Sequence, residues 1–162
     1  MTDSAAAEPV PTSARPRLLP AEDLPVGEPL DCGSHQVTEA EIVEFASEWD
    51  PQYFHVDRDA AAHSEFGGLI ASGLHTTAIF QRLAATVLYT RYDVIAGRLI
   101  RECRFLRPVW PGDVLSATAV VTSVELAGRG RAEVVIDGTL RNQAGAPVLE
   151  IEVHTLFRSR AT

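Results

Sequence analysis

A long stretch of helical apolar periodicity, over about residues 73–90, limits the folds open to this chain more than any other feature. Its main polar marks are Gln81 and Arg82, so we expect a deeply buried helix. The apolar stripe consists of Leu74, Ala78, Ile79, Leu83, Ala84, Val87 and Leu88. Ser72 directly precedes the pattern and is a suitable N-cap, because its hydroxyl can accept a hydrogen bond from a free N–H of the first turn.

Four strand-like segments follow this helix. They are rich in Val, Ile, Leu and Thr with partial alternation, and they cover about 94–107, 113–126, 131–142 and 147–158. Turns that contain proline or glycine separate them. One buried helix followed by four successive strands predicts an α+β fold in which an antiparallel sheet packs on the helix.

The length of 162 residues and a hydrophobic content of 46% fit one domain with a sizeable core. Residues 1–24 are rich in alanine, proline and charge and have little to bury. This composition predicts a flexible N-terminal arm, which could drape over the domain or over a partner subunit. The single domain is then expected to comprise residues 25–162.

Between the arm and the buried helix, we expect a short extended piece near 29–37 and a helix over about 39–48. Thr38 and Glu41 form a capping-box pattern at the start of that helix. The helix leads into the stretch from Trp49 to Asp57, and a second short helix is expected to begin at Asp57.

Asp50 and His55 are the candidate acid–base pair in that stretch. On a continuous helix, five residues would rotate the two side chains about 140° apart. Pro51 biases Asp50 away from helical backbone, so the resulting bend could aim both side chains at one small volume. In an apolar neighbourhood, burial and mutual interaction bring pKa values toward those that general acid–base catalysis needs. The structural alternative is an N-cap aspartate followed by a buried, hydrogen-bonded histidine.

The formal net charge of −8 disfavours nucleic acids and anionic membranes as partners, because both call for a basic surface. All 14 basic residues are arginine, which excludes Schiff-base chemistry on a lysine. Cys32 and Cys103 lie far apart without a motif and are expected to be reduced thiols. The sequence has neither a signal-peptide pattern nor an apolar run of about 20 residues, so a cytoplasmic location is expected.

Three motifs, taken in order, resemble the MaoC-like dehydratase family, which includes the R-specific enoyl-CoA hydratases. The first is Asp50-x4-His55-Val56-Asp57, and the second runs from Phe66 to Gly73 and opens the long helix. The third runs from Phe105 to Asp113 and follows that helix. The resemblance covers about residues 25–159, which is essentially the whole predicted domain.

The resemblance implies a hotdog fold, in which a curved antiparallel sheet wraps one long central helix, and a homodimer or larger homo-oligomer. It implies an acyl-CoA or acyl carrier protein thioester as substrate, and no cofactor apart from the coenzyme A that the substrate carries. Asp50 and His55 would hold a water and move protons during reversible hydration of an α,β double bond. The backbone N–H of Gly73 would bind the thioester carbonyl oxygen. Removing such a donor at a helix N-terminus typically lowers the rate about 10²–10³-fold.

The residues expected in the substrate pocket are Gln52, Tyr53, Phe54, Ser72 and His75. The first three depart from the family motif Gly-Asp-x-Asn-Pro-Leu-His, since glutamine replaces asparagine, tyrosine replaces proline and phenylalanine replaces leucine. These changes are expected to shape the acyl pocket differently. His75 could equally be a polar residue at a helix start. Ser72 lacks the G-x-S-x-G context of a nucleophile.

Two other functions stay open on the same fold. One is an acyl-CoA thioesterase, which the complete Asp-x4-His motif disfavours. The other is a non-catalytic acyl-CoA-binding subunit of a heteromeric dehydratase, which the intact acid–base pair disfavours.

No metal is predicted, because the possible ligands lack both an i,i+4 pair and an HExxH motif. These possible ligands are His55, Asp57, His63 and His75.

A basic strip follows the long helix and consists of Arg98, Arg101, Arg104 and Arg107. Its guanidinium groups could bind the phosphates of coenzyme A, for which their planar fork is well suited. Alternatively, the strip is a solvated strand face or the rim of a dimer interface. A spacing of three residues does not line one face of a regular strand, which favours the second interpretation.

Overall fold

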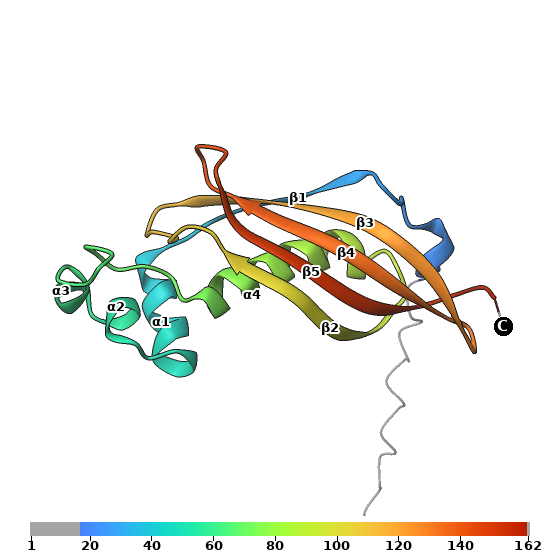
Figure 1. Cartoon of the computed structure of the whole chain (residues 1–162), viewed down its shortest axis with the longest axis horizontal. Coiled ribbons are helices and arrows are strands. Elements are labelled where there is room, and N and C mark those ends of the chain that lie inside the picture. The colour runs from blue at the N-terminus through green and yellow to red at the C-terminus, as the bar shows by residue number, and fades with distance from the viewer. Residues whose placement is uncertain (1–16, 162) are drawn as a thin grey trace, which may run out of the picture.

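Five antiparallel strands form one curved sheet around a long helix, α4, as Figure 1 shows. The structure is a computed structural model that describes residues 17–161. The strand order is β1-β3-β4-β5-β2. The strands are β1 Pro29–Gln36, β2 Val94–Phe105, β3 Val114–Gly128, β4 Arg131–Arg141 and β5 Pro147–Arg158. The predicted α+β class and the hotdog fold are confirmed.

Helix α4, Gly73–Ala84, lies at the centre of the core and continues into a π-helical segment, Ala85–Tyr89. The Ser72 hydroxyl caps it by accepting a hydrogen bond from the Leu74 N–H at 3.1 Å. Its buried side chains include Ile79, Phe80, Leu83 and Ala84. The predicted helix and its N-cap are therefore confirmed, although the last part of the helix is π rather than α.

The sheet approaches α4 closely at Gly138 on β4. Phe80 from α4 is 2% exposed, and its ring fills the space that a side chain at Gly138 would occupy. A Cβ at this position would overlap the Phe80 ring and lie 2.8 Å from Ile151 Cγ2. Gly138 falls at an inward-facing position of an alternating strand, so glycine is what permits the contact between helix and sheet.

Three shorter helices lie beside the N-terminal end of α4 (Figure 1). They are α1 Glu39–Trp49, α2 Tyr53–Val56 and α3 Arg58–Ala61. Thr38 caps α1 by accepting the Glu41 N–H at 3.2 Å, as predicted. The Glu41 carboxylate does not complete the capping box, since its Oε1 lies 2.7 Å from His35 Nε2 instead. Asp57 caps α3 through two backbone N–H groups.

Part of the predicted N-terminal arm packs on the domain. Ala21, in the 3-10 turn Ala21–Asp23, is fully buried, and Leu24 is 6% exposed. Leu19 forms a parallel bridge with Tyr92. The core therefore begins before residue 25, because these few apolar side chains meet a surface that composition alone does not reveal. The remainder of the predicted arm, residues 1–16, lies outside the described residues.

Cys32 and Cys103 are both free thiols. No helix in the described part of the chain is long and apolar enough to cross a membrane. The cytoplasmic location stays a prediction.

Replacing Gly138 with alanine is expected to lower the free energy of unfolding by about 1–3 kcal/mol, because the added methyl group must displace Phe80 or the β4 backbone. Gly97→Ala is a matched control, since no atom lies within 4 Å of a Cβ at Gly97 on the edge strand β2. Urea denaturation of both variants measures the difference. Equal stability of the two variants would show that α4 does not pack closely on β4.

Candidate active site

The bend between α1 and α2 brings Asp50 and His55 together. Asp50 follows the last residue of α1 with φ −156°, and its N–H still donates to the Ala46 carbonyl at 2.9 Å. Pro51 ends the helix here, because the residue before a proline disfavours helical backbone. The chain then turns through Gln52 into α2, and Asp50 Oδ2 lies 3.7 Å from His55 Nε2.

Two side chains hold the Asp50 carboxylate from either side. Gln52 Nε2 donates to Oδ1 at 2.8 Å, and Ser72 Oγ donates to Oδ2 at 2.6 Å. These hydrogen bonds, first that from Ser72, hold the pKa of Asp50 below its usual range, and His55 acts in the same direction against the opposing effect of desolvation. Asp50 is therefore an anion at neutral pH, with its orientation fixed.

The tautomer of His55 follows from a single contact. The residue is 4% exposed, and its Nδ1 lies 2.8 Å from the Ile70 carbonyl oxygen. Since a carbonyl oxygen can only accept a hydrogen bond, Nδ1 carries a hydrogen, and in the neutral form of the ring Nε2 presents a lone pair toward Asp50. Two acceptors cannot bond to each other, but one water molecule can donate a hydrogen to each of them.

Gly73 places the N-terminus of α4 next to this pair. As the first helical residue, it has an N–H without an acceptor inside the helix. The neighbouring Ser72 hydroxyl both caps α4 and binds Asp50, so it fixes the helix end relative to the carboxylate. Phe105 packs directly on Gly73, where an added Cβ would lie 2.8 Å from Phe105 Cζ. The result is a helix N-terminus, which favours negative charge, beside the acid–base pair.

An apolar pocket of about 380 Å³ adjoins His55 and Gly73. Aromatic and aliphatic side chains form most of its wall. The apolar members are chiefly Phe54, Phe66, Ile70, Phe105, Leu106 and Val109. Thr76 and Arg107 are polar side chains in its lining. Such a pocket suits an apolar ligand group that reaches His55 and Gly73 at one end.

The side chains predicted to line the substrate pocket have several different roles. Phe54 lines it, whereas Gln52 binds Asp50 instead. Tyr53 is 51% exposed and packs edge-on against Phe54. Ser72 is fully buried and also binds Asp50. Two of these residues therefore hold the acid–base pair rather than shape the pocket.

His75 faces a separate hollow of about 260 Å³, away from the apolar pocket. Its ring stacks on Phe45 at a centroid distance of 4.8 Å, and its Nε2 lies 3.6 Å from Glu41 Oε1. Burial lowers the pKa of His75. The structure thus places His75 outside the pocket, in contrast to the expectation, because two residues along a helix rotate a side chain by about 200° relative to Gly73.

The sequence predicted no functional role for Phe66 and Phe105, and it placed Arg107 only in the arginine strip, although all three line this pocket. All three lie in or beside segments that carry the family resemblance, and their aromatic and basic character was an available signal. What the sequence did not reveal is that the two segments meet. In the fold, the Ala71 N–H donates to the Val109 carbonyl at 2.8 Å, which joins them side by side.

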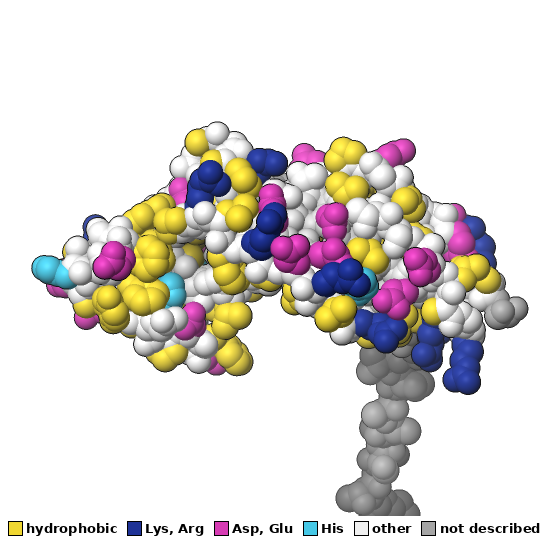
Figure 2. Space-filling model, viewed as in Figure 1, with side chains coloured by type: hydrophobic (Ala, Val, Ile, Leu, Met, Phe, Trp, Pro, Cys, Tyr) yellow, Lys and Arg dark blue, Asp and Glu magenta, His cyan; other side chains and the backbone are white. Residues whose placement is uncertain are grey.

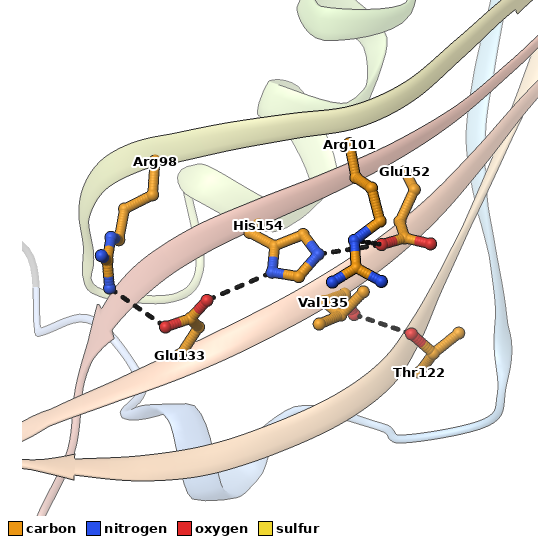
Figure 3. Close-up of polar contacts among 7 residues, drawn as sticks. All are labelled: Arg98, Arg101, Thr122, Glu133, Val135, Glu152 and His154. Carbon is orange, nitrogen blue, oxygen red and sulfur yellow. Dashed lines mark hydrogen bonds and ion pairs between the residues drawn. The ribbon is translucent and has the colours of Figure 1, made fainter.

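Three of the four arginines in the predicted strip, Arg98, Arg101 and Arg104, lie on the outer face of the sheet. Arg98 lies 3.0 Å from Glu133 Oε2, and Arg101 lies 3.3 Å from Glu152 Oε1 (Figure 3). The same two carboxylates flank both ring nitrogens of His154 and raise its pKa, the hydrogen bond to Glu152 contributing most. Figure 2 shows acidic and basic side chains interspersed over this face.

Bulges in β2 explain how residues three apart share one strand face. The pairing of β2 with β5 shifts at Arg98 and again at Arg101, and each shift adds one residue to the usual repeat of two. Arg104 pairs with Glu150 on the neighbouring strand. The spacing argument used for a regular strand is therefore wrong here, although three of the four arginines do occupy a strand face. Arg107 lies beyond β2 and lines the pocket.

The histidines and aspartate considered as metal ligands do not converge. His55 Nδ1 is used by the Ile70 carbonyl, and Asp57 caps α3. His63, in the exposed turn after α3, has its Nδ1 2.9 Å from the Asp59 carbonyl oxygen. Between residues 17 and 161, no group of three or more His, Cys, Asp or Glu side chains is arranged to hold a metal ion.

A family model, a curated protein and two solved structures that resemble this chain point to the same family. Residues 22–143 match the family model described as MaoC like domain. The 3-hydroxyacyl-thioester dehydratase Z of Mycobacterium tuberculosis is 31% identical over 116 residues, which cover 68% of this chain and 74% of that protein. The MaoC-like dehydratase from Rhodospirillum rubrum has a TM-score of 0.77 at 36% identity, covering 89% of this chain and 99% of its own. The R-hydratase PhaJ1 from Pseudomonas aeruginosa has a TM-score of 0.67 at 26% identity, covering 87% and 86%.

Ser72→Ala is expected to raise the pKa of Asp50, because it removes the hydrogen bond that most stabilises the anion. Gln52→Ala should raise it less. In both variants Asp50 would then take up its proton at a higher pH than in the wild type. A ¹³C NMR titration of labelled aspartate carboxyl groups measures the shift, with Ser64→Ala as the control, since the Ser64 hydroxyl bonds within its own turn. An unchanged Asp50 titration in Ser72→Ala would contradict the assignment.

Proposed function

Because this chain belongs to the MaoC-like dehydratase family, we propose that it adds water reversibly to an α,β-unsaturated acyl thioester, as an R-specific enoyl-CoA hydratase or 3-hydroxyacyl-CoA dehydratase. One observation carries the proposal. Asp50 Oδ2 and His55 Nε2 present two acceptors 3.7 Å apart, beside a helix N-terminus and an apolar pocket. The names of two similar proteins, a 3-hydroxyacyl-thioester dehydratase and an R-hydratase, support it.

In the proposed reaction, the acid–base pair holds the attacking water. One hydrogen of the water points to Asp50 Oδ2 and the other to His55 Nε2. As the water oxygen adds to the β carbon, His55 takes one proton and returns it to the α carbon on the same face, so the product carries OH and H from one water. Asp50 stays anionic, orients the water and stabilises the protonated imidazole.

Gly73 supplies the charge stabilisation that this addition requires. Attack at the β carbon moves negative charge onto the thioester oxygen, which becomes an enolate. The free N–H of Gly73 and the dipole of α4 lie beside His55 and favour that charge. No cofactor is needed for this chemistry, and the coenzyme A or acyl carrier protein of the thioester serves as the carrier of the substrate.

The position of β2 at the edge of the sheet makes it a candidate surface for pairing with a second copy of the chain. The strand lies at the end of the sheet order, so one side of its backbone is unpaired within the chain. It also exposes large apolar side chains, of which Ile95, Leu99 and Ile100 are 37–53% accessible. A long apolar edge strand favours pairing with another strand, and we propose that β2 of a second copy occupies this edge.

Hydration of crotonyl-CoA, followed by loss of the conjugated absorbance, tests the proposed activity. Asp50→Asn and His55→Ala are each expected to lower kcat/KM at least about 10²-fold, since each removes one holder of the water. Asp59→Asn, in α3, and His63→Ala, in the turn after it, are matched controls with exposed side chains and should retain wild-type rates.

Three outcomes would contradict the proposal. The first is no hydration of enoyl-CoA thioesters of several chain lengths by the folded wild type. The second is full activity of the folded site variants. The third is release of free thiol without loss of the double bond, which would indicate a thioesterase.

Ile100→Lys is expected to convert the proposed dimer into a monomer, because it buries a charge at the centre of the β2 edge. Leu126→Lys is the control, since Leu126 is 61% exposed on β3, away from this edge. Sedimentation velocity measures the mass of each variant. A monomeric wild type, or an Ile100→Lys protein that stays dimeric, would rule out pairing through β2.

A further inference from the structure

Arg107 is a charged side chain in the lining of the apolar pocket that the proposed reaction does not use. It follows the end of β2, is exposed, and lines the same pocket as His55 and Gly73. Its NH1 group donates to the Pro147 carbonyl at 2.6 Å. This contact holds the guanidinium in place and leaves most of its N–H groups available, since arginine carries five.

The charge of Arg107 is not neutralised by a neighbouring side chain. The other three arginines of the strip each have a carboxylate partner: Glu133, Glu152 and Glu150, respectively. Across residues 17–161, no carboxylate lies within ion-pair distance of Arg107, although the chain as a whole is acidic. A pinned cation with free donors on the wall of an apolar pocket is suited to bind an anionic group of a ligand.

We propose that Arg107 binds an oxyanion group carried by the thioester substrate, and this proposal rests on the proposed function. The group is either a phosphate of the coenzyme A or phosphopantetheine carrier or a carboxylate on the acyl part. Both present two oxygens that the planar guanidinium contacts through parallel hydrogen bonds. The substrate enters with this anion at Arg107 and its double bond at Asp50 and His55.

A purely structural role makes a different prediction. If Arg107 serves only to fix the turn before β5 through Pro147, a neutral donor would replace it, and the charge of the ligand would not matter. Arg107→Gln retains an amide donor but loses the charge. Arg107→Lys retains the charge but loses the planar guanidinium group and its parallel N–H donors. Arg104→Gln is the matched control, because Arg104 lies three residues before Arg107, at the end of β2, but pairs with Glu150 on the outer face.

The test compares three thioesters in the hydration assay: crotonyl-CoA, crotonyl-pantetheine, which lacks phosphate, and fumaryl-pantetheine, whose only anion is the acyl carboxylate. Arg107→Gln is expected to raise KM about tenfold for the thioesters that carry the recognised anion, with kcat little changed. A higher KM of Arg107→Gln for crotonyl-CoA alone identifies the phosphate as the bound anion. A higher KM for fumaryl-pantetheine alone identifies the acyl carboxylate. Arg107→Lys should be intermediate, and Arg104→Gln should match the wild type.

Two results would overturn the proposal: no effect of Arg107→Gln on any of the three substrates, or the same effect on all three, including the uncharged crotonyl-pantetheine. A binding measurement separates this failure from failure of the proposed reaction. Isothermal titration of the wild type and Arg107→Gln with coenzyme A and with fumarate reports anion binding without turnover. If the wild type hydrates none of the thioesters, weaker binding of either ligand to Arg107→Gln still supports the role of Arg107, and equal binding of both refutes it.

Discussion

The hydrogen bond from Ser72 to Asp50 joins two parts of the molecule that are otherwise arranged independently. Asp50 is placed by the bend after α1, whereas Gly73 is placed by the packing of α4 under the sheet. Ser72 Oγ lies 2.6 Å from Asp50 Oδ2 and accepts the Leu74 N–H at 3.1 Å. One buried hydroxyl therefore sets the distance between the carboxylate and the helix end. The chemistry proposed for the site needs the carboxylate and the helix end at this relative position.

The position of the α4 N-terminus relative to Asp50 also depends on how closely α4 lies against the sheet. Phe80 packs on the bare backbone of Gly138, and Phe105 packs on that of Gly73. The two glycines thus anchor the helix at its middle and at its N-terminus. A side chain at either position would push α4 away from the sheet and would move the helix end relative to Asp50. The active-site geometry is in this sense a consequence of core packing.

Local patterns predicted most of the fold because each pattern had a local physical cause. The Thr38 and Ser72 caps begin their helices as expected, and Pro51 ends α1 where the residue before a proline must leave the helix. Tertiary contacts decided what these patterns could not. The direction of His75 follows from its stacking on Phe45, and the common face of Arg98 and Arg101 follows from bulges in the pairing with β5.

The departures from the family motif affect the site unequally, and the geometry shows why. Gln52 stands where the motif has asparagine, and its longer arm still donates to Asp50 Oδ1 at 2.8 Å, so the support of the carboxylate is retained. Tyr53 points largely to solvent and adds little to the pocket wall. Phe54 is different, because it lines the pocket and packs against Phe66 at a centroid distance of 5.4 Å. In the proposed reaction, acyl selectivity is therefore expected to depend on this aromatic pair rather than on the acid–base residues.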